Sequence, residues 1–236
     1  MRIHSFESAA AVDGDGVRYC VFLHGCPLRC VYCHNPDTWE MGGEDICVEQ
    51  VAKKISRYKP YFKNGGGVTF SGGEPLLHSE EISEIGELLK KDNIGYALDT
   101  SGCVELTENV KKAVDGAELI ICDLKFWDEE SYKKYTGGSF EKVMSFLEYC
   151  EKKGKRLWIR TVVVPNINDN IDIMNKYIEI VRKLKMVEKY KLLPFHTMGF
   201  EKYEKLAIKN PLESTKPMDI QKISELQTHI NKQLER

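Results

Sequence analysis

Six short, almost continuously apolar runs alternate with amphipathic stretches, and this alternation constrains the fold more than any other feature of the chain. The runs span 17–23, 66–70, 94–102, 117–125, 156–165 and 190–196, and helical spacing follows them at 48–62, 79–91, 107–116, 139–154, 170–185 and 218–235. Strands that are apolar on both sides are typical of a parallel sheet covered by helices. We therefore predict an α/β fold built from six βα units.

Length and composition favour one intracellular domain. The chain has 236 residues, which suits a single domain spanning 1–236, and no linker rich in Pro, Gly and Ser divides it. A net charge of −2 gives no reason to expect nucleic acid or a membrane as a partner. The apolar runs are strand-sized, and the first residues lack the pattern of a secretory signal. We therefore expect a cytoplasmic protein whose cysteines stay reduced.

Unusual residues gather where the apolar runs end. A loop at 25–39 follows the first run, and Ser71–Pro75, Asp99–Gly102, Asp123–Lys125 and His196 lie late in later runs or just past them. In parallel sheets and barrels the carboxyl ends of the strands meet at one rim, where ligands bind. The sequence therefore predicts one binding site assembled from several strand ends.

The loop 25–39, here called the cysteine loop, contains Cys26, Cys30 and Cys33. Structural zinc needs four ligands, usually as two cysteine pairs, and the loop has no second pair. His34 directly follows Cys33, so strain makes it a poor ligand for the same ion. A cubane iron–sulfur cluster held by three cysteines leaves one iron open to an outside ligand. The missing fourth cysteine therefore favours a catalytic [4Fe–4S] cluster over a structural metal.

The spacing Cys26-x3-Cys30-x2-Cys33, with Tyr32 before the last cysteine, resembles the signature of the radical S-adenosylmethionine (SAM) enzymes. The resemblance implies that SAM chelates the open iron and that an electron from the reduced cluster cleaves it. The resulting 5′-deoxyadenosyl radical takes a hydrogen atom from the substrate. In such enzymes the cofactors carry the difficult chemistry, while the protein binds and orients them.

The stretch Ser71–Pro75 reads Ser-Gly-Gly-Glu-Pro and has two interpretations. A Gly-Gly pair alone marks a tight turn. After the cysteine loop it also resembles the SAM-binding GGEP stretch of the family, where glycine lets backbone carbonyls approach the SAM ammonium group. We predict Gly72 and Gly73 as SAM contacts and leave Glu74 as either a contact or a structural anchor.

The charged residues at later strand ends also have two interpretations each. Asp123 and Lys125 either form a salt bridge or bind SAM, with Lys125 at its carboxylate and Asp123 at its ribose or at a cation. Asp99 and Thr100 either cap the next helix or join Asp123 as oxygen ligands of a monovalent cation. Arg160 stands in an apolar strand and needs a carboxylate partner, because an unpaired buried charge is costly.

Longer stretches narrow the resemblance to one family. Segments 2–39, 65–75, 98–102, 123–125, 158–165 and 192–199 resemble, in this order, the glycyl-radical-enzyme activases, so that the similarity covers roughly residues 2–234. Many activases carry a ferredoxin-like insert with further cysteine clusters between the cysteine loop and the GGEP stretch. Only Cys47 lies in that interval here, so the chain resembles the compact pyruvate formate-lyase branch.

This resemblance implies an incomplete (β/α)6 TIM-like barrel, the radical SAM fold. It implies an enzyme that removes a hydrogen atom from a glycine Cα of pyruvate formate-lyase, with flavodoxin or ferredoxin as electron donor, and we expect a monomer. The implied cluster ligands are Cys26, Cys30 and Cys33. The implied SAM-binding residues are Tyr32, Cys33, His34, Asn35, Gly72, Gly73, Asp123, Leu124, Lys125, Arg160 and His196, the last of which has a satisfied core histidine as its alternative.

The chain departs from the activase pattern at two positions. Asp15 stands where the pattern usually has proline, which loosens that turn, and Cys122 stands where methionine is common, an apolar exchange.

Three alternative functions are also open. The chain could instead activate a different glycyl radical enzyme or act on a small molecule. A non-catalytic metal-binding or electron-transfer module is the third alternative, and it predicts no SAM turnover.

Overall fold

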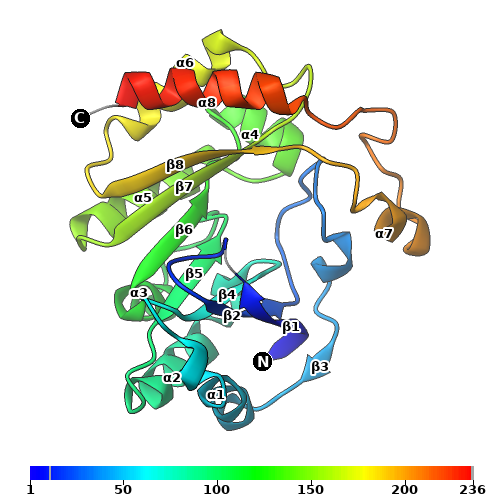
Figure 1. The fold of residues 1–236 in the computed structure, drawn as a ribbon. Helices are drawn as coiled ribbons and strands as arrows, with labels where there is room; N and C mark the ends of the chain where they lie inside the picture. Colours follow the sequence, from blue (N-terminus) through cyan, green and yellow to red (C-terminus); the bar gives the residue numbers. More distant parts are fainter. Residues whose placement is uncertain (11, 235–236) are drawn as a thin grey trace.

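The computed structural model describes residues 1–10 and 12–234, and one twisted sheet forms its centre (Figure 1). The strands are β1 (Arg2–Ala10), β2 (Arg18–Leu23), β3 (Glu44–Asp45), β4 (Gly67–Gly72), β5 (Tyr96–Thr100), β6 (Leu119–Asp123), β7 (Arg156–Val163) and β8 (Val187–Pro194). Their order across the sheet is β3-β1-β2-β4-β5-β6-β7-β8. All neighbouring pairs from β2 to β8 are parallel, which confirms the six predicted βα strands.

The sheet is an open barrel. β3 and β8 stand at the two ends of the strand order, and among the described residues no strand joins them. The predicted incomplete barrel is therefore confirmed. β1 runs antiparallel to β2, and β3 runs antiparallel to β1. The apolar pattern does not predict these two strands, because most β1 residues are partly or fully exposed and β3 has only two residues, both exposed.

Most helices of the described residues cover the outer side of the sheet, whereas the short helix at 200–205 lies beside the cysteine loop (Figure 1). The helices are α1 (Val48–Ser56), α2 (Ser79–Lys90), α3 (Glu108–Gly116), α4 (Glu129–Thr136), α5 (Phe140–Lys152), α6 (Ile171–Val181), α7 (Phe200–Lys205) and α8 (Ile220–Leu234). Four begin with a side chain that accepts a hydrogen bond from the N–H three residues on, the preferred N-cap geometry, at Thr107, Asp128, Ser139 and Asn170. None of the helices in the described ranges is long and apolar enough to cross a membrane.

Three helices differ from the prediction. α1 ends at Ser56, before the predicted stop near Pro60, because proline has no N–H to donate to the carbonyl of Ser56, and a 3-10 turn, η2 (Lys59–Tyr61), follows. α4 was not predicted, because it has no apolar stripe and depends on its Asp128 cap and on Gly137, which ends it with φ +70°. α7 has only six residues, too few for a periodic pattern.

The central strand β6 explains why the apolar runs are continuous. Successive side chains of a strand point to opposite faces. Ile120 and Cys122 belong to the main hydrophobic core, whereas Leu119 and Ile121 belong to a smaller cluster with Ala97 and Trp158. Both faces of β6 are therefore buried over residues 119–122, and each of these four positions needs an apolar residue.

We predict that Ile120→Ala lowers the free energy of unfolding by about 2–5 kcal/mol, because it leaves a cavity at a fully buried position. The matched control is Ile220→Ala, at a position where the side chain is 68% exposed. Urea unfolding of the metal-free chain, followed by circular dichroism under reducing conditions, measures both. Equal midpoints for the two variants would contradict the assigned core.

Candidate functional site

The carboxyl ends of the parallel strands surround a pocket of about 360 Å³. The predicted site residues on its lining are Cys26, Cys30, Tyr32, Cys33, His34, Asn35, Gly72, Gly73, Asp99, Thr100, Asp123, Lys125 and Arg160. The structure thus brings most of the predicted site residues together at one rim, although residues 35 and 160 are separated by more than half of the chain. Their binding roles remain predictions.

A larger hollow, of about 740 Å³, lies away from this rim. It is lined by α2, α3 and the amino end of β5, where Glu87, Lys112 and Glu118 give it mixed charge. No cysteine is part of that lining. Volume alone does not identify a functional site, whereas convergent polar groups with perturbed pKa values do. The smaller pocket is therefore the candidate site.

The cysteine loop takes its shape from other parts of the chain. Apart from the 3-10 turn η1 (Pro36–Thr38), it has no helix or strand. The N–H groups of Arg29 and Val31 donate to the carbonyls of Thr136 and Tyr135, at 2.8 and 2.9 Å, and so attach the loop to the end of α4. These bonds satisfy backbone groups that a loop would otherwise leave unpaired, and they fix the backbone between the cysteines.

The three loop cysteines form no disulfide; Cys30 is buried, and Cys26 and Cys33 are partly buried. Burial raises the pKa of Cys26 to about 11 and that of Cys30 to about 12, although the Lys125 charge opposes both shifts. Burial also raises the pKa of Cys33. Binding to a metal therefore has to displace the thiol protons. Cys20, by contrast, is fully buried within β2 and is not part of the pocket lining.

The donor set fits an iron–sulfur cluster. Across residues 1–10 and 12–234, no group of three or more His, Cys, Asp or Glu side chains is arranged to hold a metal ion. In a cubane each cysteine binds a different iron, so the three thiolates do not have to converge on one ion. Beside them, the Tyr32 hydroxyl is buried without a hydrogen-bond partner. A buried polar atom of this kind is expected where a polar ligand completes the site.

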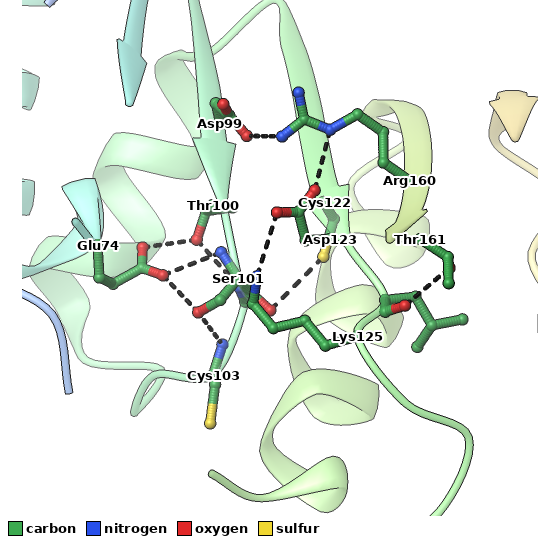
Figure 2. Close-up of polar contacts among 12 residues, drawn as sticks. Glu74, Asp99, Thr100, Ser101, Cys103, Cys122, Asp123, Lys125, Arg160 and Thr161 are labelled. Carbon is green, nitrogen blue, oxygen red and sulfur yellow. Dashed lines mark hydrogen bonds and ion pairs between the residues drawn. The ribbon is translucent and has the colours of Figure 1, made fainter. Parts of the chain in front are cut away.

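Glu74 is a structural anchor, which resolves one of the two interpretations of the GGEP stretch (Figure 2). Its fully buried carboxylate accepts hydrogen bonds from the Thr100 hydroxyl at 2.6 Å, the Ser101 hydroxyl at 2.5 Å and the Ser101 N–H at 3.0 Å. A fourth bond comes from the N–H of Leu76 at 3.1 Å. The carboxylate therefore ties the turn after β4 to the last residue of β5 and to the loop that follows it.

The two glycines of this stretch allow a close approach to neighbouring backbone, of β2 at Gly72 and of the cysteine loop at Gly73. A Cβ on Gly73 would lie 2.2 Å from the carbonyl oxygen of Gly25. Gly72 has φ +104°, a conformation that L side chains rarely adopt. The N–H of Glu74 donates to the same Gly25 carbonyl at 2.7 Å. Glycine is thus required here for packing, independently of any ligand.

Four charged side chains form an ion-pair chain across the pocket (Figure 2). Arg160 contacts Asp99 through Nη2 and Asp123 through Nε, the latter at 2.9 Å. Lys125 Nζ lies 3.2 Å from the other oxygen of Asp123. Asp99 also accepts a hydrogen bond from the Ser71 hydroxyl at 2.8 Å. The expected carboxylate partners of Arg160 are therefore Asp99 and Asp123.

The two carboxylates differ in their electrostatic environment. Burial raises the pKa of Asp99 to about 6, even though Arg160 opposes the shift. Burial alone would also raise the pKa of Asp123, but the charges of Arg160 and Lys125 lower it overall. Burial alone would lower the pKa of Lys125, and the Asp123 carboxylate raises it. Lys125 thus remains cationic beside an ionised Asp123.

The predicted monovalent-cation ligands have other partners in the structure. Asp99 and Asp123 both pair with Arg160, and the Thr100 hydroxyl donates to Glu74. Leu124 is a core residue with no exposed surface and is not part of the pocket lining. Its N–H donates to the Arg160 carbonyl at 2.9 Å. The Leu124 side chain therefore does not face the pocket in this structure, contrary to the prediction of a SAM contact. Its backbone instead helps to place Arg160.

His196 is not part of the pocket lining, although it contacts His34, which is. Its ring stacks on the ring of His34 with centroids 3.7 Å apart and an angle of 11° between the planes. His34 Nε2 also lies 3.0 Å from the His196 carbonyl oxygen. Burial and the nearby His196 lower the pKa of His34, so that its ring is neutral at physiological pH. The Nδ1 atom of His196 is buried without a partner.

The pocket also contains residues that the sequence analysis missed. Asp13, Thr38, Val162 and Leu193 are part of the lining. Val162 lies two residues after Arg160 in β7, so the period of a strand places it on the same face and could have indicated it. Asp13 lies in an irregular segment before β2 and carries no comparable signal.

Comparison with known proteins identifies relatives over the whole chain. The family model described as the Radical SAM superfamily matches residues 20–178. The pyruvate formate-lyase-activating enzyme of Clostridium pasteurianum is 43% identical over 236 residues, which cover 99% of this chain and 98% of the relative. The pyruvate formate-lyase 1-activating enzyme of Escherichia coli K12 is 38% identical, over 92% of this chain and 89% of the relative.

Solved structures show the same fold at lower identity. A domain of pyruvate-formate lyase-activating enzyme from Bacteroides vulgatus is similar, with a TM-score of 0.56 at 24% identity, over 72% of this chain and 93% of that one. A radical SAM methyltransferase from Sphaerobacter thermophilus has a TM-score of 0.65 at 15% identity, over 92% of this chain and 64% of that one. At such identities the likeness concerns the fold alone.

We predict that Glu74→Gln lowers the free energy of unfolding by about 1–3 kcal/mol. Either orientation of the glutamine amide turns an NH2 group toward two donors, one of which is the backbone N–H of Leu76 or Ser101 and cannot rotate away. Glu80→Gln is the control, since the Glu80 side chain is exposed. Urea unfolding of both variants measures the difference, and an unchanged midpoint for Glu74→Gln would contradict the anchoring role.

Proposed function

The chain belongs to the radical SAM superfamily and, within it, to the family of the pyruvate formate-lyase-activating enzymes, and from this premise we propose that it generates a glycyl radical on pyruvate formate-lyase. The observation that carries the proposal is the convergence of Cys26, Cys30 and Cys33 on a pocket that also contains buried cationic groups. The three thiolates would hold a [4Fe–4S] cluster, and three protein ligands would leave one iron free for SAM. When bound, the two cofactors supply hydrogen-atom abstraction from a glycine Cα.

In this proposal the chain binds and orients SAM. Lys125 has three donor hydrogens and one carboxylate neighbour in the pocket, so it is suited to pair with the SAM carboxylate as well. Asp123 can accept a hydrogen bond from a ribose hydroxyl while it stays paired with Arg160. The unpartnered Tyr32 hydroxyl and the edge formed by His34 and Asn35 are assigned to the adenosine side.

The protein substrate is a glycine on a loop of pyruvate formate-lyase. Glycine suits this role because it lacks a side chain, so a loop that carries it can enter a narrow pocket. We assign flavodoxin or ferredoxin as the electron donor, the cytoplasm as the location, and the monomer as the active form. A monovalent cation at Asp99, Thr100 and Asp123 would have to displace Arg160 from the two carboxylates described above, so we propose the cation only for an arrangement in which Arg160 has moved.

The decisive experiment is an anaerobic incubation of the reconstituted chain with SAM, dithionite and purified pyruvate formate-lyase. Electron paramagnetic resonance should show a glycyl radical doublet on the partner, and chromatography should show 5′-deoxyadenosine. Formation of 5′-deoxyadenosine with no radical on this partner would favour a different glycyl radical enzyme or a small-molecule substrate. No SAM turnover would leave the non-catalytic alternative.

We predict that Cys30→Ala lowers radical formation by more than about 100-fold, because it removes a cluster ligand. Replacing a residue that only hydrogen-bonds to a metal ligand already lowers metal affinity or activity by about 10- to 100-fold, and loss of the ligand itself should lower it at least as much. The matched control is Cys47→Ser, since Cys47 is an exposed thiol at the N-cap of α1, where serine is well tolerated. The radical signal per mole of chain measures both. Wild-type activity in Cys30→Ala would rule out the proposed cluster ligation.

A further inference from the structure

A segment near the carboxyl terminus contacts and holds the cysteine loop, although more than 160 residues separate the two along the sequence. This segment, 196–205, runs from the end of β8 through α7, and we call it the α7 segment. In Figure 1, α7 lies beside the blue chain that follows β2. A Cβ on Gly199 would lie 2.7 Å from the His34 carbonyl oxygen, and the Tyr203 hydroxyl donates to the Cys33 carbonyl at 3.0 Å. Tyr203 also contacts the edge of Trp39.

Lys202 makes the most specific of these contacts. Its ammonium group donates to Asn35 Oδ1 at 2.7 Å and to Asp37 Oδ1 at 3.0 Å. Asp37 is held on its other side by His4 Nε2 at 3.1 Å, so three parts of the chain meet at this carboxylate. Two acceptors on the cysteine loop therefore hold the Lys202 ammonium group in one position.

The contact with Asn35 determines how its side-chain amide is oriented. Asparagine at the start of a helix usually caps it, but the Asn35 side chain makes no capping bond to η1. An ammonium group has only donors, so it selects the oxygen end of the amide. The NH2 group then points away from Lys202, and Asn35 is part of the pocket lining. In the proposal below we assign this NH2 group as a donor to the pocket.

We propose that Lys202 is a positioning residue, which acts through Asn35 and keeps the adenosine side of the pocket in the form that binds SAM. This inference rests on the proposed function, because it assigns SAM to the same pocket. The acceptor nitrogens of an adenine ring are the matching ligand chemistry for the Asn35 NH2 group. Lys202 itself is not part of the pocket lining and does not touch the ligand in this proposal.

The test compares Lys202→Met with Lys205→Met. Methionine keeps most of the apolar length of lysine and removes the donors. Lys205 lies on the same helix, is 76% exposed and pairs only weakly, with Glu201 at 3.7 Å, so its variant controls for a lost surface charge. We expect the SAM Kd of anaerobically reconstituted Lys202→Met to rise on the order of tenfold, the effect of one lost charge-assisted contact, with Lys205→Met unchanged.

A double-mutant cycle separates positioning from general stability. If Lys202 acts through Asn35, Lys202→Met should not weaken SAM binding further in a chain that already carries Asn35→Ala. Hydrogen exchange of the Thr38 and Trp39 amides provides a readout that needs neither cluster nor SAM. We expect exchange in the cluster-free Lys202→Met chain to be roughly tenfold faster than in Lys205→Met, because η1 loses its tie to α7.

Three results would overturn the positioning role: equal SAM Kd values for the two lysine variants, additive effects in the cycle, or equal exchange rates at η1. A lower melting temperature of Lys202→Met with an unchanged Kd would also overturn it, because the residue would then be only structural. Failure of the proposed function has a different signature, since the wild-type chain itself would then neither bind SAM nor form the radical. The exchange result would still report whether Lys202 holds the loop.

Discussion

The pocket rim depends on one buried carboxylate, that of Glu74. It accepts four hydrogen bonds, from the turn that follows it, from the last residue of β5 and from the loop after β5, while the backbone N–H of Glu74 donates to Gly25 at the start of the cysteine loop. Breaking any of these bonds would leave a buried polar group unpaired, which costs far more than an exposed bond gains. The start of the cysteine loop, the turn after β4 and the end of β5 are thereby held in one arrangement. This arrangement helps to fix where the three thiols lie.

The charged groups of the pocket balance one another. Two carboxylates, Asp99 and Asp123, face two cations, Lys125 and Arg160. A buried ion-pair chain of this kind contributes little net stability, because desolvation offsets most of the attraction, but the removal of one member leaves an uncompensated charge. In the proposed function, such a chain serves as a preorganised polar surface for the charged groups of SAM rather than as a stabilising device.

The sequence predicted the parts of the fold that depend on periodicity. Residues such as Ile120 and Ile121 face opposite cores, so both must be apolar, and the six parallel strands are visible as continuous runs. The rim followed from topology, because parallel strand ends must meet. The roles of Glu74 and Leu124 did not follow, since a sequence does not specify which donors surround a carboxylate or which way a strand-end side chain points. β1, α4 and α7 lack an apolar period and were missed for that reason.

The shortness of α7 explains why the sequence did not predict it and why it depends on the cysteine loop. A helix of six residues is too short to be stable alone, so α7 depends on the contacts that Lys202 and Tyr203 make with the cysteine loop. The cysteine loop, which has only one 3-10 turn, is held in turn by α7, in addition to its bonds to the end of α4 and to the Glu74 backbone. Two marginal segments that stabilise each other order together, so anything bound by the loop must also stabilise α7. Ligand binding at the amino-terminal third of the chain is therefore linked to order near its carboxyl terminus.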